Sequence, residues 1–142
     1  MARQYEVTPA KRMVSWLMGQ AARAGLGNFA VLSMVGRRSG QPRRVTVSPI
    51  SDAEGDYLVS PYGESGWVRN VRAHPRVGLR RGGPEKPVEL VEVTGQRPDL
   101  VRAYYEREAF ARLFMDLPDD PSDDDFARFA HRFPVFRIVD RS

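Results

Sequence analysis

The stretch FAVLSMVGRRSGQPRRVTVSPI, residues 29–50, decides how the chain pairs with itself. Residues 29–35 form a short apolar run between glycines, which is typical of a buried strand. The following GRRSGQP, residues 36–42, carries two glycines and a proline and therefore predicts a turn. Residues 43–50 alternate in polarity and predict the return strand, with Pro49 placing its end at an edge or a bulge. A hairpin of this kind favours antiparallel pairing over a doubly wound parallel sheet.

Further short strands and helices are expected along the rest of the chain. The expected strands lie at 56–60, 77–79, 88–93 and 135–139, and the expected helices lie at about 8–24, at 67–74, around 100–105 and after Ser122. Ser122 and Asp125 form a pattern resembling a capping box at the start of that last helix. About six short strands with interspersed helices predict a single α+β domain over residues 1–142, with a mostly antiparallel sheet closed as a small barrel.

The composition excludes several classes of protein. A chain of 142 residues with 42% hydrophobic residues is expected to fold as one globular domain. The absence of cysteine excludes disulfides and thiolate–metal sites, and with only His74 and His131 no metal site is expected. Neither a run of about 20 apolar residues nor a signal-peptide core is found, so a cytoplasmic setting is expected.

The positive charge is unevenly distributed. The formal charge is +4, and lysine occurs only at positions 11 and 86, so arginine supplies the other 20 of 22 basic residues. Four arginines fall within residues 36–44 and five within 69–81, whereas six aspartates fall within 116–125. This segregation predicts a positive face on the molecule. No nucleic-acid motif is found and the basic segments lack interleaved aromatics, which argues against a nucleic-acid partner.

The basic turn at residues 36–44 has the chemistry of an anion site. Glycines allow close approach of the backbone to a ligand, and turn amides can form an anion-binding concavity. Arg37, Arg38 and Arg43 add planar donor groups suited to phosphate or carboxylate. A solvated hairpin is the alternative interpretation. The absence of a GxxxxGK[ST] pattern argues against a nucleoside triphosphate.

A second block, SPYGESGWVRNVRAHP at residues 60–75, concentrates Trp67, Arg69, Asn70 and Arg72 in six positions. On a helix Arg69 and Arg72 lie on one face, three residues apart. An anion bound near such neighbouring cations reduces their mutual repulsion. The alternative is that Trp67 belongs to the core and the arginines face solvent.

Together the blocks GRRSGQPR and GWVRNVRAHPRV resemble the deazaflavin-dependent nitroreductase and F420H(2)-dependent quinone reductase family, as does the closing FPVFRIV. The resemblance covers roughly residues 29–139. It implies a split β-barrel of the FMN-binding, pyridoxamine-phosphate-oxidase-like type with short peripheral helices. It also implies coenzyme F420, a hydride carrier with a phosphate-linked oligoglutamate tail, as the cofactor.

The resemblance further implies which residues contact the cofactor. The tail and phosphate would be contacted by Arg37, Arg38, Ser39, Gln41 and Arg43. The region between the phosphate and the deazaflavin would be bordered by Ser60, Tyr62 and Gly63. The cofactor would be held in position by Trp67, Asn70 and Arg72. Members often read Ser-Lys-Gly where this chain has Pro61-Tyr62-Gly63, and an aromatic residue where Val68 stands. Some members carry a run of tyrosines in the last helix. This chain has Phe126 and Phe129 there instead, and Asp123 stands at a position where a tyrosine is expected. A different substrate pocket is therefore expected, and reduction of nitro compounds is not assumed.

The expected reaction is hydride transfer from reduced F420 to a quinone or an activated enone. The proton donor is expected to be Tyr62, Tyr104, Tyr105 or water, with Ser48 as a weaker candidate. Each of these tyrosines has core packing as its alternative role. Two rival functions stay open: a split-barrel reductase that uses FMN, and a carrier of F420 or a lipid without turnover.

The surroundings of the protein are less constrained. The first helix carries Lys11, Arg12 and Arg23 beside Trp16 and Leu17, so it is expected either to cover one end of the barrel or to rest on an anionic membrane. The oligomeric state is expected to be a monomer or a homodimer.

Overall fold

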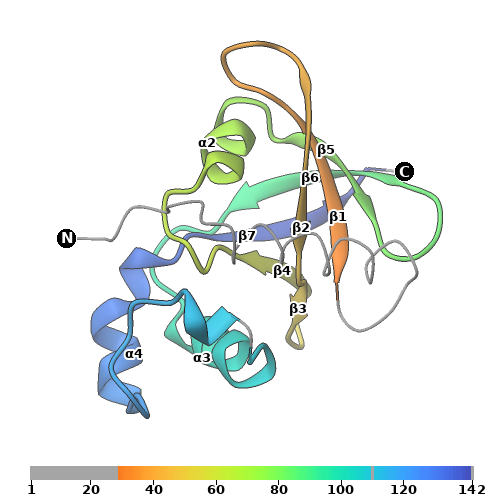
Figure 1. Cartoon of the computed structure of the whole chain (residues 1–142). Coiled ribbons are helices and arrows are strands. Elements are labelled where there is room, and N and C mark those ends of the chain that lie inside the picture. The colour runs from red at the N-terminus through yellow and green to blue at the C-terminus, as the bar shows by residue number, and fades with distance from the viewer. Residues whose placement is uncertain (1–28, 110, 142) are drawn as a thin grey trace.

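The computed structural model describes residues 29–109 and 111–141, and the helix expected at about 8–24 lies outside them. One seven-stranded antiparallel sheet forms the centre of the fold (Figure 1). Its strands are β1 (Ala30–Val35), β2 (Pro42–Val47), β3 (Ile50–Ser51), β4 (Asp56–Val59), β5 (Arg76–Arg80), β6 (Lys86–Glu92) and β7 (Val135–Asp140). The helices of the described part are α2 (Gly66–Ala73), α3 (Pro98–Arg107) and α4 (Asp123–Phe129), with short 3-10 turns at Ala111–Leu113 and Ala130–Arg132.

The predicted first hairpin is confirmed. β1 pairs antiparallel with β2 in a register that runs from Ala30 opposite Val47 to Val35 opposite Pro42. The turn is closed by Gly36 N–H donating to the Gln41 carbonyl at 2.8 Å. Gly40 has φ +70°, a conformation that is open to glycine and costly for most other residues. Alternate residues of β1 are buried, so one face of the hairpin packs on the core.

The return strand predicted over residues 43–50 is wrong in its extent, because the chain bends at Ser48 and Pro49 and divides it into β2 and β3. The order of strands is β2-β1-β5-β6-β7-β4-β3, so β2 and β3 form the two opposite edges of the sheet. Only two residues separate them, and the sheet must therefore curl until its edges meet at this bend. The result is a half-barrel, rather than the fully closed small barrel expected from the number of strands.

Two cores lie on opposite faces of the curled sheet. The first fills the half-barrel under α2 and includes Leu32, Leu58, Trp67 and Phe136. The second packs α3 and α4 against β3, β4 and β7, and its buried residues include Tyr104. Adjacent residues of β4 alternate between the two cores, as the period of a strand requires. Each face of β4 is thus covered, and the pocket described below lies where the cores meet.

The helix boundaries follow local signals. Ser122 caps α4: its hydroxyl accepts from the Asp125 N–H, and the Asp125 carboxylate accepts from the Ser122 N–H, which confirms the predicted capping box. Pro98 stands in the first turn of α3, where its missing N–H is not needed. Within the described residues, no helix is long and apolar enough to cross a membrane.

Candidate functional site

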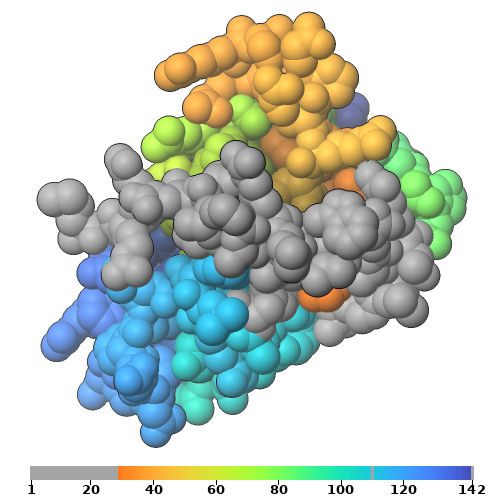
Figure 2. All heavy atoms as spheres, viewed as in Figure 1, coloured from red at the N-terminus to blue at the C-terminus, as the bar shows by residue number. Residues whose placement is uncertain are grey.

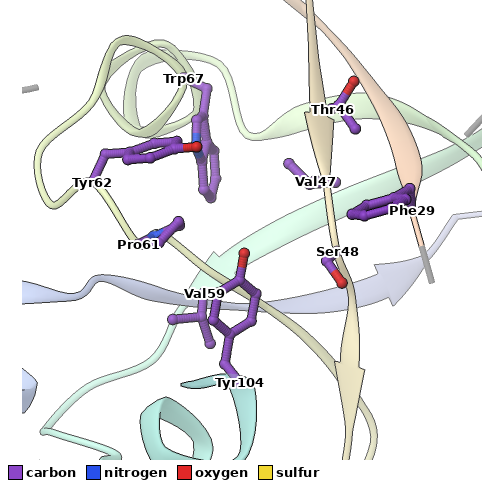
Figure 3. Close-up of a pocket in the computed structure, with 9 residues that line it drawn as sticks. All are labelled: Phe29, Thr46, Val47, Ser48, Val59, Pro61, Tyr62, Trp67 and Tyr104. Atoms are coloured by element: carbon purple, nitrogen blue, oxygen red, sulfur yellow. The ribbon is translucent and has the colours of Figure 1, made fainter. Parts of the chain in front are cut away.

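A narrow pocket lies beside β2, an edge strand of the described sheet (Figure 3). It contains about 330 Å³ of unfilled space, part of it open to solvent. Figure 3 shows Trp67 and Tyr62 on one side, Val47 on the other, and Tyr104 rising from α3 with its hydroxyl toward the space between them. Walls of this kind, apolar and aromatic with a few hydroxyl groups, suit a planar ring. The lining residues are Phe29, Thr46, Val47, Ser48, Val59, Pro61, Tyr62, Trp67 and Tyr104.

Tyr104 is the most deeply buried hydroxyl-bearing ring of the pocket. Its residue surface is 2% exposed, and its hydroxyl has no hydrogen-bond partner within the described part of the chain. Burial raises the pKa of Tyr104 far above its ordinary value of 10.0, and the nearby Tyr62 and Glu108 act in the same direction. The phenol therefore stays neutral at physiological pH and can donate a hydrogen bond.

Two other predicted residues line the same pocket. Trp67 is 7% exposed and packs on Phe136 with ring centroids 5.6 Å apart, so it belongs to the core and to the pocket wall at once. Tyr62 is half-buried and packs on Phe114 with centroids 5.5 Å apart. The structure thus brings Tyr62, Trp67 and Tyr104 together around one space.

The turn and α2 are joined by a single amide. The backbone N–H and the Nη1 of Arg37 both donate to Asn70 Oδ1, each at 3.0 Å. Asn70 is 8% exposed, so this acceptor is shielded from water. The two basic blocks of the sequence, 33 residues apart at this contact, therefore lie side by side. Figure 2 shows the turn projecting at the top of the molecule with α2 directly beneath it.

The remaining arginines of these blocks fall into two groups. Arg38, Arg43 and Arg69 are exposed and make no ion pair with any described residue. Arg72 instead donates to Glu92 at 2.7 and 2.8 Å and pairs with Glu64. Hydrogen bonding to Glu92 is the main cause that raises the pKa of the Arg72 guanidinium above its usual range. The charge of Arg72 is thus met by protein carboxylates.

Four further predicted residues stabilise loops. The fully buried Ser60 donates to the Gly63 carbonyl at 2.7 Å. Gly63 has φ +71°, and a Cβ there would lie 3.2 Å from the Arg132 carbonyl oxygen. Ser39 Oγ accepts from the Gln41 N–H at 3.1 Å, within the turn.

Tyr105 is placed away from the pocket. Its ring packs edge-on against Phe126 at 5.5 Å, and the Arg112 guanidinium lies over it at 4.9 Å. It is not among the residues that line the pocket.

Sequence reasoning named Ser48 as a weaker candidate proton donor but missed the polar cluster to which it belongs. Ser48 Oγ donates to Glu108 Oε1 at 2.5 Å, and Arg107 Nε donates to the same oxygen at 3.0 Å. Glu108 is only 6% exposed, although glutamate side chains are rarely buried unless they are paired. The spacing contained a signal: Glu108 follows Tyr104 by four residues and so continues the buried stripe of α3.

A second groove, on the outer face of β1, β2 and β5, contains no predicted site residue. It is wide and open, with about 910 Å³ of unfilled space. Its lining residues are Val31, Ser33, Arg44, Arg80, Gly83, Pro84 and Glu85. Within residues 29–109 and 111–141 no three His, Asp or Glu side chains gather closely enough to hold a metal ion. The pocket beside β2 is therefore the candidate site.

Comparison with known proteins decides the family. Residues 9–111 match the model of the F420H(2)-dependent quinone reductase family. The chain belongs to this family. No curated protein matches it. F420-dependent reduction is the activity that the family name carries, and the acceptor is a separate question.

Solved structures support the same fold. An F420-H2 dependent reductase, FDR-A, superposes with a TM-score of 0.51 at 21% identity, over 80% of this chain and 94% of its own. A FAD-binding protein from Mesorhizobium loti gives 0.52 at 15% identity, over 90% and 91%. A structure described as a domain-swapped dimer gives 0.53 at 19% identity, over 92% and 96%. At these identities the likeness concerns the fold, and the predicted split-barrel type is confirmed.

Proposed function

We propose that this protein transfers a hydride from reduced coenzyme F420 to a quinone or an activated enone. One observation carries the proposal: the Arg37–Asn70 hydrogen bonds join the basic turn to α2, whose Trp67 lines the pocket. Arg38 and Arg43 belong to that turn and Arg69 to α2, and none of the three has an acid partner among the described residues. A cofactor with a planar ring and a polyanionic tail needs both features in reach of one another.

The residues fit the two halves of the cofactor. Arg38, Arg43 and Arg69 keep their charge free of protein carboxylates in the described part, as a phosphate and a string of glutamates require. The pocket between Trp67 and Val47 offers flat apolar walls to the ring. Arg72 is assigned a different task, because its donors are taken by Glu64 and Glu92. It holds α2 against β6.

The cofactor, when bound, supplies the hydride; the chain supplies position and environment. Guanidiniums that bind a remote tail fix the ring without touching its reacting atoms. The apolar walls exclude water from one side of the ring. Tyr104 is a hydrogen-bond donor rather than an acid, since its raised pKa opposes loss of the proton. Tyr62 or water then supplies the proton that the reduced acceptor takes up.

The proposal is tested with reduced F420 and either menadione or a coumarin-type enone in a steady-state assay. Oxidation of the cofactor that depends on protein and acceptor is the expected result. Absence of oxidation, together with absence of F420 binding at micromolar concentration, would overturn it. Binding without turnover across several acceptors would instead favour the carrier, and a bound chromophore absorbing as a flavin would favour FMN.

The neighbour described as a domain-swapped dimer supports a homodimer over a monomer for this chain. Sedimentation of the purified protein tests this assembly. A single species of about 16.1 kDa would contradict it.

A further inference from the structure

The Tyr104 hydroxyl faces the pocket and makes no hydrogen bond with another residue of the described part, and this inference rests on the function proposed above. A hydroxyl that faces a pocket and makes no hydrogen bond with the protein has its proton available for a bound ligand. The hydroxyl of Ser48, which lines the same pocket, does have hydrogen-bond partners. The Ser48 hydroxyl donates to Glu108 and accepts from Arg107 Nη2 at 3.1 Å, so its proton is already committed.

The cluster around Ser48 ties the floor of the pocket to its wall. Ser48 stands at the bend where β2 ends, and Glu108 stands directly after α3. Arg107 bridges them by donating to Glu108 Oε1, to Ser48 Oγ and to the Pro49 carbonyl. A carboxylate this buried is tolerated because a guanidinium and a hydroxyl both neighbour it. Removing one member leaves the others unsatisfied and loosens the contact between helix and bend.

Tyr104 lies one helical turn before Glu108, on the same face of the helix. Because the end of α3 is fixed to the bend, the direction of the Tyr104 ring is fixed relative to the β2 edge. Figure 3 shows the resulting arrangement, with the Tyr104 hydroxyl directed at the space beside Val47 and Trp67.

We propose that the Tyr104 hydroxyl donates a hydrogen bond to a carbonyl oxygen of the F420 ring, and that Ser48, Glu108 and Arg107 are the positioning residues that hold it in place. The chemistry selects a carbonyl. A neutral phenol among apolar side chains suits an uncharged acceptor, whereas phosphate or carboxylate is better met by the exposed guanidiniums near the turn. A ring without a carbonyl at this point leaves the hydroxyl unsatisfied.

Tyr104→Phe removes this hydroxyl and keeps the ring that packs in the second core. Titration of the protein into F420, followed by absorbance, is expected to show about tenfold weaker binding and a smaller shift of the absorption maximum, since one hydrogen bond is lost. The melting temperature without ligand is expected to stay the same or to rise, because no residue in 29–109 or 111–141 makes a hydrogen bond with this hydroxyl. Tyr105→Phe is the matched control, one position along the same helix, and is expected to change neither quantity.

The positioning role is tested by a double-mutant cycle. Ser48→Ala is expected to weaken F420 binding about three- to fivefold in the wild-type background and to have no further effect in Tyr104→Phe, because it acts through Tyr104. Glu108→Gln, which keeps an oxygen for Ser48, is expected to have the smaller effect of the two. Additive losses would contradict the positioning role.

Three results would overturn the inference. Equal F420 affinity in wild type and Tyr104→Phe would show that Tyr104 makes no hydrogen bond to the ring, and would leave the proposed function intact. A raised KM for menadione with an unchanged F420 affinity assigns the hydroxyl to the acceptor instead. Failure of the wild-type protein to bind F420 overturns the proposed function and this inference together.

Discussion

The arginines of the turn and those of α3 use the same side chain in opposite ways. On α3 and at its start, every arginine is neutralised: Arg97 pairs with Asp52 and Asp99, Arg102 with Glu106, and Arg107 with Glu108. Among the four arginines within residues 36–44, none pairs with an acid in the described part, and Arg37 bonds only to an amide. An arginine-rich composition thus conceals two populations, and only the unpaired one has charge available for a ligand.

The difference has a physical cost that points to function. Each pair on α3 offsets its own desolvation with a nearby opposite charge. Unpaired guanidiniums that lie near one another repel, and this repulsion lowers the stability of the fold. A bound anion reduces the repulsion. The comparison therefore predicts which arginine substitutions weaken F420 binding and which lower the free energy of unfolding.

The largest effect is expected from Arg38→Ala, Arg43→Ala and Arg69→Ala combined. Each contact with the anionic tail is worth roughly 1 kcal/mol at an exposed position, so F420 binding is expected to weaken about 100-fold. Fluorescence titration at low ionic strength measures it. The loss is expected to shrink in high salt, because screening already weakens these contacts in the wild type.

The matched control removes the same number of charges from arginines that have acid partners: Arg76→Ala, Arg81→Ala and Arg102→Ala. With both variants titrated at about 0.15 M salt, binding to this control is expected to change by less than about threefold, because screening over roughly 8 Å leaves only charges near the tail effective. A loss as large as in the first variant would mean that total charge, not position, controls binding.

A smaller effect is expected from Asn70→Asp. The aspartate keeps an oxygen for the Arg37 donors, so the melting temperature is expected to hold or rise. Its negative charge beside the anion site is expected to weaken F420 binding about tenfold, from a repulsion of about 1–2 kcal/mol. Unchanged affinity would place the tail away from Asn70.

Arg72→Ala is expected to lower the free energy of unfolding by about 0.5–1 kcal/mol, a range typical of pairs as exposed as those with Glu64 and Glu92. Urea unfolding measures the change. F420 affinity is expected to move less than about threefold, since the guanidinium is engaged by carboxylates. A strong loss of affinity with unchanged stability would return Arg72 to the anion-binding group.

The smallest effect concerns acid. Hydrogen bonding from Arg97 lowers the pKa of Asp99, and the Glu54 N–H with Arg97 lowers that of Asp52, both below 3.8. Their contribution is therefore present above 3.8 and lost as the pH falls through the lowered pKa. The gap in urea midpoint between wild type and Arg97→Ala is expected to shrink from about pH 6 to about pH 2.5. The Arg97 guanidinium also lies over the Tyr57 ring, 5.5 Å from its centroid, and a constant gap would show that this contact is how Arg97 stabilises the fold.

Local features were predictable from sequence, and contacts between distant segments were not. The hairpin turn and the Ser122 capping box depend on neighbours a few residues apart, which the sequence displays directly. The pairing of Arg72 with Glu92 joins a helix to a strand 20 residues later, so the sequence showed the cation without its partner. The division of the return strand at Pro49 likewise depends on the curl of the whole sheet.

The candidate site divides in the same way. Resemblance to the family pointed to Trp67, Tyr62 and the basic turn, whose residues stand in recognisable motifs. The β2 edge and Glu108 carry no motif, because their role follows from the meeting of α3 and the bend at Ser48. The one signal in the sequence that could have pointed to Glu108 is its spacing of four residues from Tyr104, which continues the buried face of α3.

The most direct test compares F420 with the same deazaflavin lacking the phosphate and the glutamate tail, each titrated against wild type and the Arg38, Arg43 and Arg69 triple alanine variant. If unpaired guanidiniums bind the tail and the pocket binds the ring, wild type prefers F420 by about 100-fold and the variant binds both ligands alike. An equal preference for F420 in both proteins would contradict the account.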